Sequence, residues 1–295
     1  MCPQYNNSPG GWANGINILR KFLNEHQEDK RHWRSMSSTD LDIDLLQQAL
    51  AAGVIGRQIH HYDTLGSTMD ETRRLAEAGS EEGTVVIAEE QTAGRGRFNR
   101  AWISPRGQNL SFSVLLRPTS EQLPFMNMAA TLAVARTVTD VADLSPTIKW
   151  PNDVRVGSLK ISGILIETAI EENKVHHAVV GIGLNVNFDP SKYEEIADIS
   201  TSLYRETSRM HSRTEVLQRL LKHFDELYAT VRRGESLVPI WEQQLDTLGK
   251  WVRLGWQDSI VEGRAEAVDE QGNLILRLAD GSSFTATAGE VTSQV

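Results

Sequence analysis

Apolar side chains recur at two different spacings along the chain, which indicates that helices and strands are mixed. Between Leu123 and Val141 they recur every three or four residues, which predicts an amphipathic helix. Residues 83–91 are rich in β-branched side chains, and residues 109–118 alternate until Pro118, so both predict strands. The same criteria predict further helices over 41–53, 67–78, 213–231 and 237–248, and three or four strands between 147 and 186.

The pattern changes after Gly249 to short alternating runs that are separated by the turn sequences DEQGN and ADGS. This predicts a small antiparallel barrel of roughly 45 residues. The longer part before it lacks the regular strand-helix alternation of a doubly wound sheet, so we assign it to the α+β class. We therefore expect an α+β domain over residues 39–248 and a barrel over residues 249–295.

The first 38 residues differ from the rest of the chain, because they begin with a stretch rich in Gly, Asn and Pro and end in a mixed-charge run. We expect residues 1–38 to form a poorly ordered extension. The alternative is a DNA-binding helix-turn-helix unit. Such a unit needs about three helices, and one weak helical pattern is visible there.

Composition narrows the class of protein. Of 295 residues, 40% are hydrophobic and 23% are charged, as in ordinary folded chains, and the net charge of −9 argues against a protein that binds nucleic acid mainly through positive charge. Cys2 is the single cysteine, which excludes a disulfide framework and makes a reducing, cytoplasmic location our expectation. We expect no signal peptide and no membrane-spanning helix, since no stretch approaches roughly 18 consecutive apolar residues.

An arginine-rich and glycine-rich segment, EEQTAGRGRFNRAW, begins at the end of a predicted strand. Glycine lets the backbone approach a ligand closely, and arginine forms paired hydrogen bonds with phosphate or carboxylate. Gly94, Arg95, Gly96 and Arg97 therefore indicate an anion-binding loop, with a flexible, solvent-exposed loop as the alternative. The segment does not match the dinucleotide-binding motif, and the chain has no Walker-type Gly-Lys-Ser/Thr sequence.

The segment TIKWPNDVRVGSLKISGILIET contains two further candidates. Trp150-Pro151-Asn152-Asp153 has the composition of a tight turn, which by itself would explain these residues. Lys160 precedes an apolar run that reads as a central strand, where a lysine needs either an anion or a route to solvent. A ligand-binding lysine and an edge lysine that extends to solvent remain the two alternatives.

A buried strand is predicted over residues 176–188, with Gly181 and Gly183 in its interior. Glycine weakens a strand unless another group lies close against the backbone. That group could be a helix or a flat ligand. The chain shows no Ser/His/Asp pattern for a covalent mechanism, and its adjacent histidine pairs would point to opposite faces of a strand, which disfavours a metal site.

Together these segments resemble biotin protein ligases, also called biotin-acetyl-CoA-carboxylase ligases. The resemblance rests on GRGR followed by W-x-S-P-x-G-x-N-L, then KWPND, K-x-S-G-I-L-x-E and GIGLNVN, and it extends from about Asp63 to the C-terminus. It implies a catalytic domain like that of class II aminoacyl-tRNA synthetases, with a mixed β-sheet and flanking helices, and then an SH3-like barrel. It also implies that biotin and ATP with Mg²⁺ give biotinyl-5′-AMP, from which a lysine of a biotin carboxyl carrier protein receives the biotin.

The resemblance implies a group of residues that contact biotin. The residues that match hydrogen-bonding partners of biotin are Ser67, Thr68 and Gln91. The residues that match the loop closing over biotin and the phosphate are Gly94, Arg95, Gly96 and Arg97. Trp102 corresponds to an aromatic residue that shapes this loop, Gly163 borders the pocket, and Lys160 matches a lysine that contacts the biotin carboxylate and the transferred phosphoryl group.

A second group implied by the resemblance contacts the nucleotide. Lys149, Asn152 and Asp153 lie where the family places contacts with Mg-ATP, and Asp153 is the expected metal ligand. Asn185 matches an asparagine of the adenylate site, and residues 189–199 would fold over the adenine. From both groups, we expect Lys160, Arg95 and Arg97 to act in catalysis.

The chain departs from the family pattern at three positions. Met69 stands where the family usually has asparagine, so that biotin contact is lost or is made by the backbone. Phe98 and Asn99 replace a common Arg/Gln-Gly pair, which makes the loop less basic. The resemblance is to the short form of the family, without a DNA-binding domain, so we do not expect DNA or membrane binding; a homodimer is left open. The alternatives are a lipoate or octanoate ligase or transferase of the same fold, and a biotinyl-AMP-sensing repressor.

Overall fold

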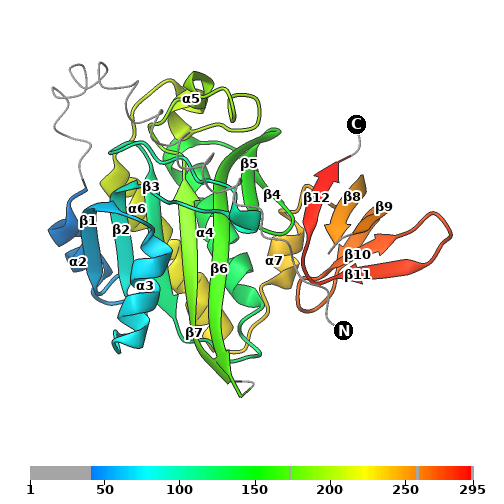
Figure 1. Ribbon diagram of the computed structural model, residues 1–295, viewed down its shortest axis with the longest axis horizontal. Helices are drawn as coiled ribbons and strands as arrows, with labels where there is room; N and C mark the ends of the chain where they lie inside the picture. Colours follow the sequence, from blue (N-terminus) through cyan, green and yellow to red (C-terminus); the bar gives the residue numbers. More distant parts are fainter. Residues whose placement is uncertain (1–40, 173, 257–258, 294–295) are drawn as a thin grey trace, which may run out of the picture. The chain divides into compact units, whose positions relative to one another are not determined.

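The computed structural model describes residues 41–172, 174–256 and 259–293. The predictions for residues 1–38 lie outside the described residues. The described strands form one sheet of seven strands and one sheet of five. Figure 1 shows the two long neighbouring strands β6 and β7 in the middle of the larger sheet.

The larger sheet is mixed, as expected for an α+β domain. Its strands are β1 (Ile59–Leu65), β2 (Val85–Gln91), β3 (Leu110–Leu116), β4 (Pro146–Lys149), β5 (Asp153–Val156), β6 (Leu159–Glu171) and β7 (Lys174–Leu184). They lie in the order β1-β2-β3-β7-β6-β5-β4. Strands β1 and β2 pair in parallel, while the other pairs are antiparallel. The predicted strands over 83–91 and 109–118 are confirmed as β2 and β3.

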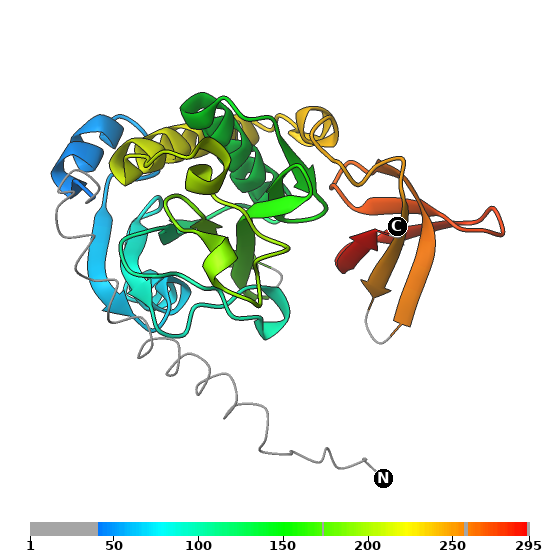
Figure 2. The same cartoon turned by 90° about the horizontal axis from the view of Figure 1, so that it is seen from above.

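Helices cover both faces of this sheet. They are α2 (Ile43–Leu50), α3 (Thr68–Glu77), α4 (Phe125–Ala142), α5 (Leu203–Thr207), α6 (Arg213–Arg232) and α7 (Val238–Glu242). Figure 2 shows α4 and α6 on one side of the sheet and α3 on the other. Because α4 lies between the sheet and α6, it is buried on most of its circumference. No helix in the described part of the chain has both the length and the apolar surface to span a bilayer.

The segment after Gly249 forms the smaller, antiparallel sheet. Its strands are β8 (Trp251–Trp256), β9 (Ser259–Val268), β10 (Leu274–Arg277), β11 (Ser283–Ala286) and β12 (Glu290–Ser293), in the order β11-β10-β9-β8-β12. The predicted small antiparallel unit is therefore confirmed. Among the described strands β11 and β12 do not pair with each other, so closure into a barrel stays a prediction, as do the domain boundaries.

One predicted helix is much shorter than expected. The pattern predicts a helix over 237–248, but α7 ends at Glu242. The chain then runs alongside β4, where the Ile148 N–H donates to the Gln244 carbonyl (2.7 Å) and the Asp246 N–H donates to the Ile148 carbonyl (2.9 Å). These backbone hydrogen bonds with a sheet edge replace the ones that a longer helix would have made.

Candidate active site

Glycines on β6 and β7 make a flat surface on which other side chains lie directly. A Cβ atom added to Gly183 would overlap the indole ring of Trp102, and one added to Gly163 would lie 3.6 Å from the same ring. Gly163 and Gly183 are paired across the two strands. Gly181 has the thioether of Met69, from α3, against it in the same way. The close approach predicted from the strand glycines is thus made by a helix residue and an indole.

We expect Gly183→Ala to displace Trp102 and to weaken biotin binding. Overpacking of this kind costs roughly 1–3 kcal/mol, so biotin affinity should fall about tenfold, as measured by titration calorimetry. Gly255→Ala is the matched control, because its Cβ would meet the nearest atom at an ordinary 3.8 Å. Equal biotin affinity in both variants would show that the Trp102 position is unimportant.

The residues expected to hydrogen-bond biotin meet where β2 ends and α3 begins. The backbone N–H and the hydroxyl of Thr68 both donate to Gln91 Oε1, at 2.8 and 3.1 Å. The Thr68 hydroxyl also shares a hydrogen bond with Ser113, at 2.8 Å. Ser67 Oγ is buried and has no hydrogen-bond partner among the described residues. A buried polar group without a partner is expected to bind a ligand or water, and among the described residues this applies to Ser67 Oγ and to Trp102 Nε1 of the candidate site.

Residues 94–102, which we call the arginine loop, form a short hairpin. Its stem is paired by the Trp102 N–H and the Gly94 carbonyl (3.0 Å) and by the Gly96 N–H and the Arg100 carbonyl (2.8 Å). At its tip, Phe98 is 61% exposed and has a left-handed backbone conformation with φ of 55°. A side chain is rarely found there, so the tip carries local backbone strain.

Arg95 is anchored by two carboxylates on different elements. It donates two hydrogen bonds to Asp70 on α3 (2.9 and 2.8 Å) and reaches Glu167 on β6 at 3.1 Å. The Arg95 guanidinium holds the pKa of the Asp70 carboxyl below its usual value. Arg95 therefore ties the arginine loop to α3 and to β6.

The other two arginines of the loop reach the turn after β4 and the smaller sheet. Arg97 donates to Asn152 Oδ1 (3.0 Å) and to the Gly289 carbonyl (2.9 Å). Arg100 forms two hydrogen bonds with the carboxylate of Glu290 (2.5 and 2.6 Å). Both acceptors that Arg97 has in the described part of the chain are neutral, so no carboxylate there is hydrogen-bonded to its guanidinium.

Lys160 lies beside the glycine surface and faces a carboxylate. Its Nζ is 2.7 Å from Asp153 Oδ1 and 5.8 Å from the centre of the Trp102 ring. The backbone of Lys160 pairs with Ile199 and Thr201, through hydrogen bonds of 2.9 and 2.8 Å. The structure therefore brings Lys160 together with the expected nucleotide residue Asp153 and with the segment expected to cover the adenine.

Asn185 is largely occupied by neighbouring groups. Its amide nitrogen donates to the Thr201 carbonyl (2.9 Å), and its oxygen accepts from Asn109 (3.3 Å). The side chain is 4% exposed. Its contact with an adenylate stays a prediction, and the role visible here is to hold the 199–201 segment against β7.

An ion pair between α6 and β2 was not foreseen from the sequence. Arg213, the first residue of α6, is 1% exposed and donates to Glu89 on β2 at 2.7 Å. The Glu89 carbonyl also accepts from the Gly107 N–H (3.2 Å). The pair fixes the end of β2, where Gln91 follows. Its two members are 124 positions apart in the sequence, and no local motif marks them.

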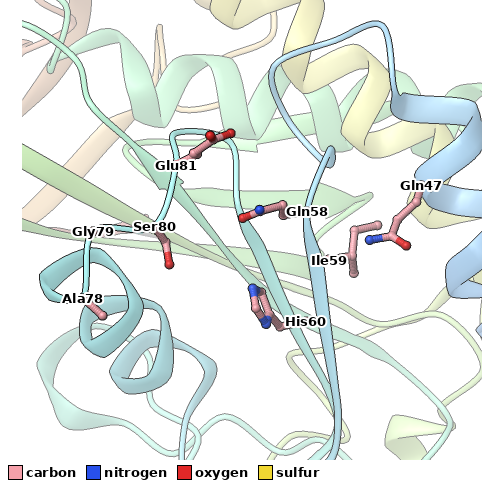
Figure 3. A pocket seen from close by; sticks show the side chains of 8 residues that line it. All are labelled: Gln47, Gln58, Ile59, His60, Ala78, Gly79, Ser80 and Glu81. Carbon is pink, nitrogen blue, oxygen red and sulfur yellow. The ribbon is translucent and has the colours of Figure 1, made fainter.

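A hollow of about 490 Å³ lies elsewhere, beside the edge strand β1. Figure 3 shows its lining, which includes Gln58 just before β1, His60 on β1, Gln47 from α2 and Glu81 from the turn before β2. It contains neither lysine nor arginine and none of the candidate residues. We therefore take the glycine surface and the arginine loop as the candidate active site.

Fold and site together define a class of protein. Residues 64–185 match the Biotin/lipoate A/B protein ligase family, and residues 247–292 match the Biotin protein ligase C terminal domain. The first match contains the arginine loop, Lys160 and the strand glycines, and the second contains the smaller sheet. The class is that of ligases that attach biotin or lipoate to proteins.

Individual relatives narrow this class. The chain is 34% identical over 237 residues to the bifunctional ligase/repressor BirA of Bacillus subtilis, over 79% of this chain and 73% of that protein. It is 33% identical over 258 residues to the biotin-[acetyl-CoA-carboxylase] ligase of Mycobacterium tuberculosis, over 84% of this chain and 93% of that protein. The solved structure of the biotin protein ligase from Aquifex aeolicus in complex with biotin and ATP matches with a TM-score of 0.68 and 30% identity, over 81% of this chain and 99% of that one. The chain belongs to the biotin protein ligase family.

Proposed function

We propose that this chain activates biotin with ATP as biotinyl-5′-AMP and transfers the biotin to a lysine of a biotin carboxyl carrier protein. The observation that carries the proposal is that Trp102 of the arginine loop, Lys160 and Met69 all lie against the strand glycines, with the buried Ser67 hydroxyl two positions before Met69. The family membership supports biotin and ATP as the reactants, and we assign them to this surface.

The first step needs charge neutralisation and alignment. An oxygen of the biotin carboxylate attacks the α-phosphorus, the bond from that phosphorus to the bridging oxygen breaks, and pyrophosphate leaves with the electron pair. Biotin supplies the nucleophile itself, so no protein nucleophile or base is required. The side chains must hold two anions in line, which favours fixed cations over acid-base groups.

The proposed roles follow from position. Ser67, Thr68 and Gln91 bind the biotin head group, and Met69 packs under it on Gly181. Lys160 lies between the residues proposed to bind biotin and Asp153. It contacts the biotin carboxylate and the transferred phosphoryl group. Arg95 and Arg97 close the arginine loop over both reactants, which keeps water from the mixed anhydride.

Magnesium is expected with ATP. The described residues contain no group of three or more His, Cys, Asp or Glu side chains that could hold a metal ion by themselves. Mg²⁺ commonly binds one or two carboxylates and completes its shell with substrate phosphates and water. Asp153, with one oxygen paired to Lys160, fits as a single carboxylate ligand for magnesium that arrives with the nucleotide. Bound there, the ion would neutralise phosphate charge.

In the second step the carrier lysine attacks the acyl carbon of the adenylate, and AMP leaves. The match of residues 247–292 to the Biotin protein ligase C terminal domain favours biotin over lipoate or octanoate as the acid. The repressor alternative depends on the N-terminal region, most of which lies outside the described residues, and we do not propose it.

Incubation of the chain with labelled biotin, Mg-ATP and a carrier domain tests the function. We expect label on the carrier lysine that requires ATP, and none on a carrier whose lysine is replaced by arginine. Unlabelled lipoate and octanoate in excess serve as competitors. If lipoate or octanoate is attached to the carrier and biotin is not, the sister activity is the correct one.

A further inference from the structure

Three neighbouring strands at one edge of the larger sheet present charged residues on the same face. Lys149 pairs with Asp153 across β4 and β5, and Arg155 pairs with Lys160 across β5 and β6, beyond a register shift. Side chains two positions apart on a strand share a face. We call Lys149, Asp153, Arg155 and Lys160 the charged face. The opposite face of the same strands, with Val154, belongs to the hydrophobic core.

Two of the cations on the charged face lack partners. Lys160 is paired with Asp153, but neither Lys149 nor Arg155 has a hydrogen bond or ion pair within the described residues. Arg155 Nε is buried without a hydrogen-bond partner. Buried polar groups are almost always hydrogen-bonded, and exceptions indicate a missing ion, water or ligand.

Positive charge also exceeds negative charge around this face. Arg97, which donates to Asn152 beside the charged face, is a fourth cation next to Lys149, Arg155 and Lys160. Asp153 is the carboxylate on the face itself. Glu290, a carboxylate that also interacts with Lys149, is occupied by Arg100. Burial, together with the charge of Arg155, holds the pKa of the Lys149 ammonium below its usual value. In a chain with a net charge of −9, this local excess of cations requires a particular explanation.

The strand order relates the charged face to the residues proposed to bind biotin. The residues proposed to bind biotin lie on β2, at the start of α3 and on the glycines of β6 and β7. Lys160 lies at the start of β6, and Arg155 and Lys149 follow on β5 and β4. Across the sheet the reactants must lie in the order biotin, carboxylate with α-phosphate, and then the two terminal phosphates. The outer strands therefore face the group that leaves.

We infer that Arg155 is a binding residue for the pyrophosphate part of the nucleotide, with Lys149 as its companion. The inference rests on the proposed function and adds to it the residues that receive the leaving group. When the bond from the α-phosphorus to the bridging oxygen breaks, the electron pair stays with pyrophosphate. A guanidinium and an ammonium on β5 and β4 stabilise that added charge without any proton transfer.

Equilibrium binding of inorganic pyrophosphate to the full chain tests the inference. We expect Arg155→Met to raise the dissociation constant of pyrophosphate at least about tenfold, because a charge-assisted hydrogen bond is lost, and to leave biotin binding within about twofold of the parent. Arg219→Met is the matched control, since Arg219 is exposed on α6 and pairs with Glu215. Steady-state kinetics should show a raised KM for ATP with an unchanged KM for biotin.

Arg155→Lys separates charge from geometry and replaces Arg155→Met if the methionine variant does not fold. It keeps the charge but lacks Nε, so we expect pyrophosphate affinity between those of the parent and the methionine variant. Parental pyrophosphate affinity in a folded Arg155→Met protein, or an equal loss of biotin affinity, would overturn the inference. If the parent binds pyrophosphate through Arg155 but forms no biotinyl-AMP, the proposed function fails and the binding site stands.

Discussion

Lys160→Ala is expected to reduce biotinyl-AMP formation about a hundredfold to a thousandfold, the range seen when one preorganised group that stabilises transition-state charge is removed. Lys160 Nζ lies 2.7 Å from Asp153. Its loss therefore removes a cation from the reacting centre and also leaves the Asp153 carboxylate unpaired, where it repels the incoming anions. Release of pyrophosphate from ATP in the presence of biotin measures the effect.

The matched control for this prediction is Lys222→Ala, because Lys222 is exposed on α6. It should release pyrophosphate at the parental rate. A normal rate in Lys160→Ala as well would show that Lys160 takes no part in activation. A raised KM for biotin with an unchanged kcat would assign the lysine to substrate binding alone.

Arg95→Gly is expected to leave adenylate formation possible but to let the adenylate escape from the site. Arg95 holds the arginine loop to α3 and β6 through Asp70 and Glu167. Loss of charge-assisted hydrogen bonds worth about 1.5–3 kcal/mol in total should increase the open population of the loop about tenfold or more. Labelling of exposed lysines on an added bystander protein measures the escape.

A double variant and a control separate the anchoring of Arg95 from its charge. Asp70→Asn combined with Glu167→Gln keeps the Arg95 guanidinium and removes its carboxylate partners, so it should also increase bystander labelling, though less. Arg106→Gly is the control, because Arg106 is exposed and pairs with Asp63 outside the arginine loop. Selective labelling of the carrier alone by Arg95→Gly would contradict the anchoring role.

Much of the fold could be predicted because local pattern and tertiary role agree. The helix over 123–141 is confirmed as α4 within a few residues, since its apolar periodicity reflects burial between sheet and helix. The edge strand β1 was not among the predicted strands, because its sequence, IHHYDTL, is mostly polar and half of it is exposed. The predicted helix over 237–248 was wrong beyond Glu242, because a sheet edge offered its backbone better partners.

The candidate site could also be predicted only in part from the sequence. Its motif residues are contiguous in the sequence and could be found there. Their partners could not, since Glu167 is 72 positions from Arg95 and Glu290 is 190 positions from Arg100. Arg155 carries no motif, and only the pairing of β5 with β6 places it beside Lys160. Such pairings depend on strand register, which a single sequence does not specify at long range.

The glycine surface has a consequence for altering the acid that this enzyme accepts. A Cβ atom added to Gly183 would overlap the Trp102 ring, and one added to Gly163 would lie 2.7 Å from Lys160 Nζ, so a side chain at either glycine would displace a candidate site residue. Met69 lies against Gly181 and Trp102 against Gly183, so we expect smaller side chains at these two positions to uncover the glycines and to give room for a bulkier vitamin analogue. Selectivity engineering in this chain therefore begins at those two residues.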